Sequence, residues 1–320
     1  MNENSTASTL RRHEKYDHLI AAAKSLQPIA TAVAHPCDET SLRGAVEAGE
    51  AGLIKPILVG PKDKIAAAAK QYSLNLGNIE IVDVPDSQAA AEKAVELVRT
   101  GKADLLMKGS LHTDELLSEV MKRETGLRTG RRVSHVFVMD VPGHAQTLFI
   151  TDAAVNIAPD LISKRDIIQN AIDLYAGLGL GIPKVAILSA VETVTSTIPS
   201  TIEAAALCKM ADRGQITGGE LDGPLAFDNA ISPEAARIKG IKSPVAGQAQ
   251  ILVVPDLEAG NMLAKNLTFL SHADAAGIVL GARVPIILTS RADHVRTRMA
   301  SCAVAALLRH SQMAKQPIGA

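Results

Sequence analysis

Short apolar runs alternate with helix-length segments from one end of the chain to the other. Ten runs have the length of buried strands: residues 29–33, 56–59, 79–82, 105–107, 136–139, 148–150, 185–188, 251–254, 277–280 and 286–288. Segments with helical spacing lie between most of them, including 87–99, 163–175, 200–211 and 258–270. Strands that alternate with helices need crossover connections, which are typical of a largely parallel sheet covered by helices. The sequence therefore predicts an α/β fold.

Ten strands are many for one sheet in a chain of 320 residues, so two α/β domains with a cleft between them fit the pattern better. The turn signal Asp140-Val141-Pro142-Gly143 separates two neighbouring runs and predicts an antiparallel pair at the crossing into the second domain. We expect a first domain of residues 1–145 plus 284–320 and a second domain of residues 146–283.

Composition excludes several classes of partner. The net charge is −1, from 33 basic and 34 acidic residues, so no charge excess favours nucleic acid or a membrane surface. With no Trp, three Tyr and four Phe, base stacking is disfavoured as well. Cys37, Cys208 and Cys302 are isolated, which predicts a reduced, cytoplasmic protein. The nine histidines show no metal-ligand spacing, so we expect no metal site.

Polar groups follow several of the predicted strands. They are Lys108-Gly109-Ser110, Thr151-Asp152, Ser189, Asp256 and Ser290-Arg291. Ligands of open α/β sheets bind beyond the carboxyl ends of strands, so we expect these ends to line one cleft. In the last group a hydroxyl, a guanidinium and the Asp293 carboxylate lie within four residues, which suits a phosphate or an acyl group.

Residues 126–132 form a glycine-flanked cluster that contains Arg128, Arg131 and Arg132. Glycine lets the backbone approach an anion, and arginine forks bind phosphate bidentately, although an exposed basic loop has the same composition. Residues 243–261 are dense in small side chains, which fits either a groove for an extended ligand or an ordinary turn, strand and helix cap.

Two patterns concern helix boundaries rather than binding. Residues 177–181 contain three glycines, but they end a helix and precede a strand, whereas a dinucleotide fingerprint follows a strand and opens a helix. We therefore expect a helix to end there. Ser200 with Glu203 fits a capping box at the start of another helix.

From Asp104 to the end, the chain resembles the phosphate acetyltransferase and phosphate butyryltransferase family. Six ordered blocks carry the resemblance: residues 107–113, 126–135, 151–156, 219–224, 243–261 and 290–291. The arginine-rich block is more similar to the butyryl branch. The resemblance implies a two-domain fold of the isocitrate/isopropylmalate dehydrogenase type and a homodimer. It also implies reversible transfer of an acetyl or butyryl group between coenzyme A and inorganic phosphate.

The resemblance also implies partners and site residues. Coenzyme A is a substrate, no cofactor is permanently bound, and an acyl-phosphate kinase uses the product. The family's catalytic pair matches Ser290 and Arg291, and its aspartate matches Asp293 if a short deletion precedes it. A family arginine on the helix after residue 113 has no counterpart in 114–120, and Arg128 or Arg131 could replace it. Lys108, Ser110, Arg128, Arg131 and Asn261 are expected to bind phosphate or coenzyme A.

We expect phosphate to attack the thioester directly in a ternary complex, because no Ser–His pair or Gly-x-Ser-x-Gly elbow is present. Arg291 would neutralise phosphate and the developing oxyanion, and Ser290 would bond the sulfur or the carbonyl. Asp293 would either move the proton or orient Arg291. Two alternatives remain open. One is a non-catalytic sensor of acyl-CoA or acyl phosphate, and the other is a metal- and NAD-dependent dehydrogenase of the same fold.

Overall fold

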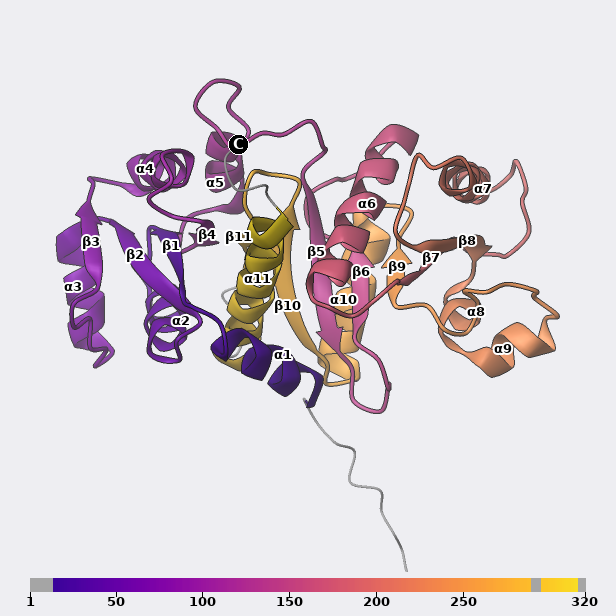
Figure 1. Ribbon diagram of the computed structural model, residues 1–320, viewed down its shortest axis with the longest axis horizontal. Coiled ribbons are helices and arrows are strands. Elements are labelled where there is room, and N and C mark those ends of the chain that lie inside the picture. The colour runs from indigo at the N-terminus through magenta and orange to yellow at the C-terminus, as the bar shows by residue number, and fades with distance from the viewer. Residues whose placement is uncertain (1–13, 289–294, 316–320) are drawn as a thin grey trace, which may run out of the picture.

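The computed structural model describes residues 14–288 and 295–315, which form helices on both faces of an 11-stranded sheet (Figure 1). The strands are β1 (Ile29–Ala34), β2 (Ile54–Gly60), β3 (Glu80–Asp83), β4 (Leu105–Lys108), β5 (Ser134–Asp140), β6 (Leu148–Thr151), β7 (Lys184–Leu188), β8 (Glu220–Leu225), β9 (Ile251–Val253), β10 (Asp274–Leu280) and β11 (Ile286–Ile287). The helices are α1 (Glu14–Lys24), α2 (Glu39–Glu50), α3 (Lys62–Gln71), α4 (Ser87–Arg99), α5 (Thr113–Val120), α6 (Leu161–Gly177), α7 (Pro199–Asp212), α8 (Phe227–Ile231), α9 (Pro233–Ile238), α10 (Leu257–Leu270) and α11 (Val295–Lys315). No helix of the described ranges is long and apolar enough to cross a membrane.

The strand order is β3-β2-β1-β4-β11-β10-β5-β6-β9-β7-β8. The first half, from β3 to β11, is parallel throughout, and so is the second half, from β6 to β8. Between them, β10 is antiparallel to both β11 and β5, and β5 is antiparallel to β6. The strands of the two halves therefore run in opposite directions.

The predicted α/β class is confirmed, and all ten predicted strands are present. The antiparallel pair of β5 and β6 is confirmed too, but the strands form one continuous sheet instead of two. The prediction missed β8, an edge strand that includes Gly223 and Pro224, because these residue types usually indicate a turn. The division into domains stays a prediction.

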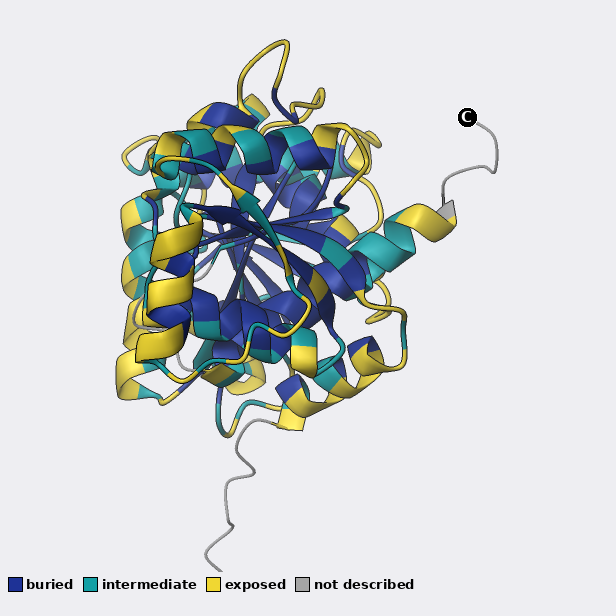
Figure 2. Cartoon of the chain, turned by 90° about the vertical axis from the view of Figure 1, so that its left-hand side faces the viewer, coloured by how far each residue is buried: buried dark blue, intermediate teal, exposed yellow. Residues whose placement is uncertain are grey.

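The core is aliphatic and lies on both faces of the sheet. Figure 2 shows buried strands between helices whose outer faces are exposed. Phe149 on β6 packs edge-to-face against Tyr175 on α6, with ring centroids 5.1 Å apart. The other large buried side chains are leucine, isoleucine and methionine, together with Tyr16. Closely packed parallel strands favour such a core because both sheet faces are covered.

Helix boundaries follow local chemistry. The helix end predicted at residues 177–181 is confirmed, because α6 ends at Gly177. The predicted capping box is wrong: α7 begins at Pro199 after Ile198, which provides no side-chain cap. Instead, the Ser200 hydroxyl lies 2.8 Å from that of Ser189, and Glu203 pairs with the buried Lys164 on α6. The two residues of the predicted capping box are therefore engaged by the loop after β7 and by α6.

The N-terminal helix α1 is fastened to the centre of the sheet. The hydroxyl of the fully buried Tyr16 donates to the carbonyl of Val138 on β5 and accepts a 2.5 Å bond from the N–H of Ala276 on β10. Lys15 forms an ion pair with the buried Asp140 at 2.9 Å. At the same time, Asp17 pairs with Arg296 of α11. Helix α1 therefore joins the two central strands to the last helix.

Candidate functional site

The residues predicted to be catalytic, Ser290, Arg291 and Asp293, lie outside the described residues. The strand that precedes them, β11, is described and lies between β4 and β10. The N–H of Leu288 donates to the carbonyl of Gly277 at 3.3 Å, which ties the chain to β10 immediately before this segment. Since β4 and β11 are parallel, their carboxyl ends lie at the same edge of the sheet.

At that edge, the ends of β1 and β4 are joined through Ser110. Its N–H donates to the carbonyl of His35 at 2.9 Å, and its hydroxyl donates to the same oxygen at 2.7 Å. The hydroxyl also accepts a bond from the N–H of Cys37 at 3.3 Å. Gly109 allows this close approach, since a Cβ there would lie 2.2 Å from the carbonyl oxygen of Ala34. The predicted binding residue Ser110 is therefore part of a rigid backbone junction.

Lys108 ends β4 and is only 7% exposed, and its ammonium donates to the Gly109 carbonyl at 3.2 Å. A largely buried cation attracts anions strongly, because little water screens its charge. Burial, assisted by Lys64, lowers the pKa of the neighbouring His35. Burial also raises the pKa of Cys37 to about 11, so this thiol is protonated at neutral pH and is a poor nucleophile.

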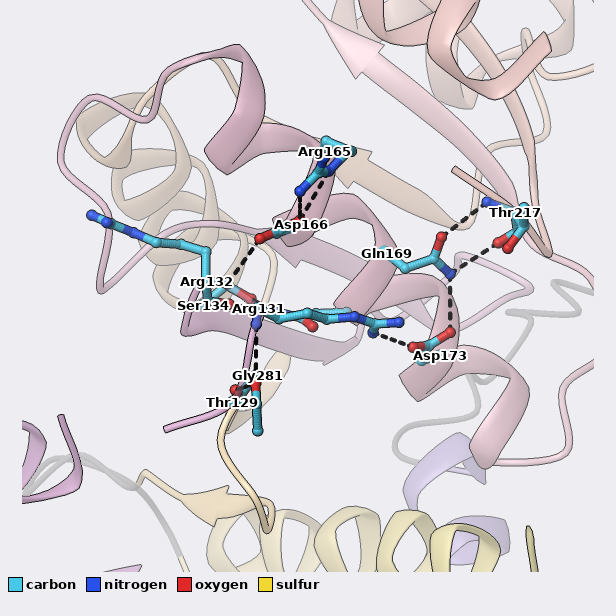
Figure 3. A network of polar contacts seen from close by, with 11 residues as sticks. Thr129, Arg131, Arg132, Ser134, Arg165, Asp166, Gln169, Asp173, Thr217 and Gly281 are labelled. Atoms are coloured by element: carbon cyan, nitrogen blue, oxygen red, sulfur yellow. Dashed lines mark hydrogen bonds and ion pairs between the residues drawn. The ribbon is translucent and has the colours of Figure 1, made fainter. Parts of the chain in front are cut away.

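The arginine cluster lies between α5 and β5, against α6 (Figure 3). Three hydrogen bonds fix this segment, one from its own Thr129 side chain and two with side chains of α6. The Thr129 hydroxyl donates to the Gly281 carbonyl at 2.6 Å, Asp166 accepts the N–H of Arg132 at 2.9 Å, and Asn170 donates to the Arg132 carbonyl at 2.9 Å. The segment is consequently fixed although its arginines are exposed.

The three guanidinium groups of this cluster differ in their partners. Arg131 forms an ion pair with Asp173 of α6, and the Nε of Arg132 donates to Asn156 Oδ1 at 2.8 Å. The side chain of Arg128 has no hydrogen-bond or ion-pair partner among the residues that the structure describes. All three line a pocket of about 240 Å³ whose other wall includes Ser163, in the first turn of α6. The N-terminus of α6 is capped there by Asp160, which accepts the N–H of Ser163 at 2.8 Å, and Asp166 also lines the pocket, so the three arginines supply its positive charge.

The turn after β6 carries another group of polar residues. Asp152 is 3% exposed and accepts bonds at 3.0 Å from the N–H groups of Ala154 and Val155. Asn261, a predicted binding residue on α10, donates to the carbonyl of Ala153 in this turn at 3.3 Å. Asn261 is therefore placed beside the second half of the sheet, on a different element from Lys108.

In the sequence, His112, His135 and His144 lie near predicted strand ends, where either contact with a ligand or a structural role fits; the structure buries His135 within β5, close to Asp152. Burial lowers its pKa to about 4, and the Asp152 carboxylate opposes this only in part. The ring is thus neutral at pH 7 and packs edge-to-face on Phe137, with centroids 4.4 Å apart. A histidine in an apolar strand gives no sequence signal that separates a core role from a functional one.

The polar strand ends lie at opposite edges of the sheet, and the expectation that they line one cleft stays a prediction. Lys108 and Ser110 lie at the carboxyl end of β4 in the first half, whereas Thr151, Ser189 and Asp256 lie at the carboxyl ends of strands of the second half, which run the opposite way. The reversal results from three successive antiparallel pairings, β11 with β10, β10 with β5 and β5 with β6. Alternation of strands and helices reveals the elements but not the direction in which each half points.

Comparison with known proteins identifies the family. The model described as "Phosphate acetyl/butaryl transferase" matches residues 87–306. A phosphate acetyltransferase of Rhizobium meliloti is 74% identical over 94% of this chain and 96% of its own length. A phosphate butyryltransferase of Clostridium beijerinckii (strain ATCC 51743 / NCIMB 8052) is 44% identical over 92% of this chain and 98% of its length. The higher of these two identities is thus to a protein named for acetyl transfer.

A solved branched-chain phosphotransacylase from Enterococcus faecalis V583 has the same fold, with a TM-score of 0.77 and 32% identity. That match covers 88% of this chain and 99% of the other. The six sequence blocks, the fold and the full-length relatives agree with one another. The chain belongs to the phosphate acetyltransferase and phosphate butyryltransferase family and is a phosphate acyltransferase.

Proposed function

We propose that the protein transfers an acetyl group reversibly between coenzyme A and inorganic phosphate, so that acetyl-CoA and phosphate yield acetyl phosphate and free coenzyme A. The observation that carries the acetyl assignment is the 74% identity to a phosphate acetyltransferase along nearly the whole chain. The buried cation of Lys108, at the edge of the sheet where β11 also ends, supports a binding place for the reacting phosphate.

The chemistry we propose is a direct displacement. A phosphate oxygen forms a bond to the thioester carbonyl carbon, the carbon–sulfur bond breaks, and the thiolate that leaves takes up a proton. Both reactants are anionic, so holding them together needs fixed positive charge, which Arg291 and Lys108 supply. Ser290 bonds the sulfur or the carbonyl oxygen, and Asp293 carries the proton. Orienting two reactants correctly contributes roughly 7–11 kcal/mol in favourable cases. None of these steps needs a permanently bound cofactor.

The exposed arginine pocket suits the nucleotide end of coenzyme A better than the reacting phosphate. Arg128 and Arg131 are exposed, so an anion bound there keeps part of its hydration, which a coenzyme phosphate tolerates. The reacting phosphate gains from desolvation, and Lys108 and Ser110 lie in a more buried place. Asn261, beside the turn after β6, completes the proposed set for coenzyme A.

We propose a cytoplasmic homodimer that hands acetyl phosphate to an acyl-phosphate kinase. Helix α10 supports the dimer, because Met262, Phe269 and Leu270 are 65%, 70% and 73% exposed. A second copy would cover these apolar side chains, since large side chains of this kind are enriched at the cores of subunit interfaces. Light scattering of the double variant Phe269→Glu with Leu270→Glu should give a monomer. A dimer of unchanged mass would place the interface elsewhere.

The test of the activity is thiol release from acetyl-, propionyl- and butyryl-CoA, each with and without phosphate. We expect release that depends on phosphate and is fastest with acetyl-CoA. Faster release from butyryl-CoA would keep the reaction and change the acyl group. Binding of acyl-CoA without any release would contradict the reaction and favour the non-catalytic sensor.

A further inference from the structure

We propose that Phe137, at the centre of β5, limits the length of the acyl group that the enzyme accepts, together with Ala275 and Leu288 beside it. The proposal rests on the proposed function and deepens it, because it names the surface that selects the acyl group. None of these three residues is among the site residues predicted from the sequence.

The two faces of the sheet differ in how their buried apolar side chains are grouped. Within the described ranges, one face carries a continuous core that extends from α1, α2 and α3 through α11 to α6 and α7. Val138 of β5 and Ile278 of β10 belong to this core. The next residue along each strand, Met139 and Val279, points to the other face, and there the two belong to different clusters. One cluster lies under α4 and α5 and the other around α8, α9 and α10, so the core of this second face is interrupted at the centre of the sheet.

Partly exposed apolar side chains lie at this interruption. Leu288 packs against the cluster of the first half, whereas Phe137 and Ala275 pack against that of the second half. Phe137 is opposite Gly277 in the register of β5 and β10, and the N–H of Leu288 donates to the Gly277 carbonyl. Ala275 is two residues from that glycine and so shares its face. We call Phe137, Ala275 and Leu288 the central strip.

Phe137 is the residue of β5 that reaches the solvent, since the other six residues of this inner strand are buried. The His135 ring packs edge-to-face against it, with centroids 4.4 Å apart and an angle of 75° between the ring planes. His135 in turn lies over Gly277, because a Cβ on that glycine would be 3.0 Å from His135 Nε2. The Phe137 ring is therefore packed on one side and open on the other, as in the wall of a ligand site.

The place of the central strip in the chain connects it with the reaction. Leu288 precedes the proposed catalytic residues Ser290 and Arg291 by two and three positions. The strip is apolar, so it suits the hydrocarbon part of an acyl group better than phosphate or the nucleotide of coenzyme A, which are charged. Its largest side chain, Phe137, fills space that a longer acyl chain needs. A short acyl group such as acetyl fits beside the ring.

The experiment measures kcat/KM for acetyl-, propionyl- and butyryl-CoA at saturating phosphate. A methylene group that an apolar pocket accepts or rejects changes kcat/KM about 10- to 200-fold. Phe137→Leu should therefore lower the ratio of the acetyl to the butyryl kcat/KM by about tenfold, and Phe137→Ala should lower it further. Ala275→Val adds bulk to the same strip without opening a cavity, so it should raise this ratio.

Phe149→Leu is the matched control, because it removes the same atoms from a phenylalanine on the neighbouring strand β6. Phe149 is fully buried, belongs to the continuous core of the opposite face and packs against Tyr175. This variant should lower the melting temperature and leave the ratio of the acetyl to the butyryl kcat/KM unchanged. An equal change of the ratio in Phe137→Leu and Phe149→Leu would overturn the proposal, since a loosened core would then explain both.

Two other results would overturn the proposal while the proposed function stands. One is an unchanged ratio in both Phe137 variants. The other is a rise of the KM by the same factor for free coenzyme A and for all three acyl-CoA substrates, which would place the pantetheine arm on the strip instead of the acyl group.

If the wild type shows no phosphate-dependent thiol release, the proposed function fails instead. Calorimetric titration of acetyl-CoA and butyryl-CoA into the wild type and Phe137→Leu then tests the inference by itself. The affinity for butyryl-CoA relative to acetyl-CoA should be higher in the variant, and an unchanged relative affinity would overturn the inference.

Discussion

Tyr16→Phe removes one hydroxyl from the contact that fastens α1 to the central strands. The ring stays and fills the same space, so the change isolates the hydrogen bonds. In the wild type this hydroxyl accepts from the N–H of Ala276 and donates to the carbonyl of Val138, and both contacts are buried. In the variant, the N–H of Ala276 loses the Tyr16 hydroxyl as its acceptor, and because the contact is buried, water does not replace it.

A buried polar group that loses its partner costs about 1–3 kcal/mol. The Val138 carbonyl adds less, because a carbonyl oxygen has two lone pairs and β-sheet carbonyls bond their neighbours. We therefore expect the free energy of unfolding to fall by about 2 kcal/mol. At about 2–4 °C per kcal/mol for large domains, the melting temperature should fall by roughly 4–8 °C. The effect should be at the lower end, since this chain has 320 residues.

Circular dichroism during a thermal scan at fixed rate measures the shift. Tyr175→Phe is the matched control: its ring is 9% exposed, and its hydroxyl has no hydrogen-bond partner among the described residues. That variant should melt within about 1 °C of the wild type, because only a hydroxyl without a partner is lost. Equal shifts of the melting temperature in the two variants would refute the reasoning, since the hydrogen bonds of the Tyr16 hydroxyl would then contribute nothing to stability.

Three further predictions concern activity, packing and pH. Arg291→Ala should lower the rate of phosphate-dependent thiol release by on the order of a hundred- to a thousandfold with an unchanged melting temperature, and near-normal turnover would contradict the mechanism. Gly109→Ala should lower the free energy of unfolding by about 1–3 kcal/mol, because its Cβ would lie 2.2 Å from the Ala34 oxygen. Gly130→Ala, which meets nothing within 4 Å, should melt like the wild type, and similar scans for the two would refute this. His135 has a pKa of about 4 when folded and an ordinary value of 6.5, so only the unfolded state takes up its proton between these values. Stability should therefore fall as pH drops from 6.5 toward 4, by up to about 1.4 kcal/mol per unit from this group. His135→Gln should flatten that part of a denaturation-against-pH curve, and an unchanged slope would assign the loss to other groups such as His35 and His144, whose pKa values are also lowered.

The helices and strands of this fold were predictable because the spacing of apolar residues and the length of apolar runs indicate which segments are buried. Apolar runs identified ten strands, and even the short β11 was found. The pairing of β10 with both β11 and β5 was not predictable, since strand direction depends on which distant segments meet. The edge strand β8 was missed because its apolar pattern is interrupted by residues that also form turns.

The residue types of the arginine cluster were predictable from the sequence, but the hydrogen-bond and ion-pair partners of these arginines were not. Arg128, Arg131 and Arg132 stand out in the sequence, but nothing there reveals that Asp173 engages the second and Asn156 the third. These partners come from α6 and from the turn after β6, and only folding brings them to the cluster. Hydrogen bonds between segments far apart in the sequence produce no periodic pattern of residues, so they cannot be predicted from the sequence.

The middle of the sheet is built from the last part of the chain. Strands β10 and β11 separate β4 from β5 in space, although they are synthesised after all the other strands. Until they leave the ribosome, β4 and β5 each have an open edge, and open edges promote association between chains. The growing chain therefore cannot complete its native sheet before nearly all of its residues have emerged. A premature stop upstream of residue 274 should yield an aggregating fragment rather than a smaller folded domain.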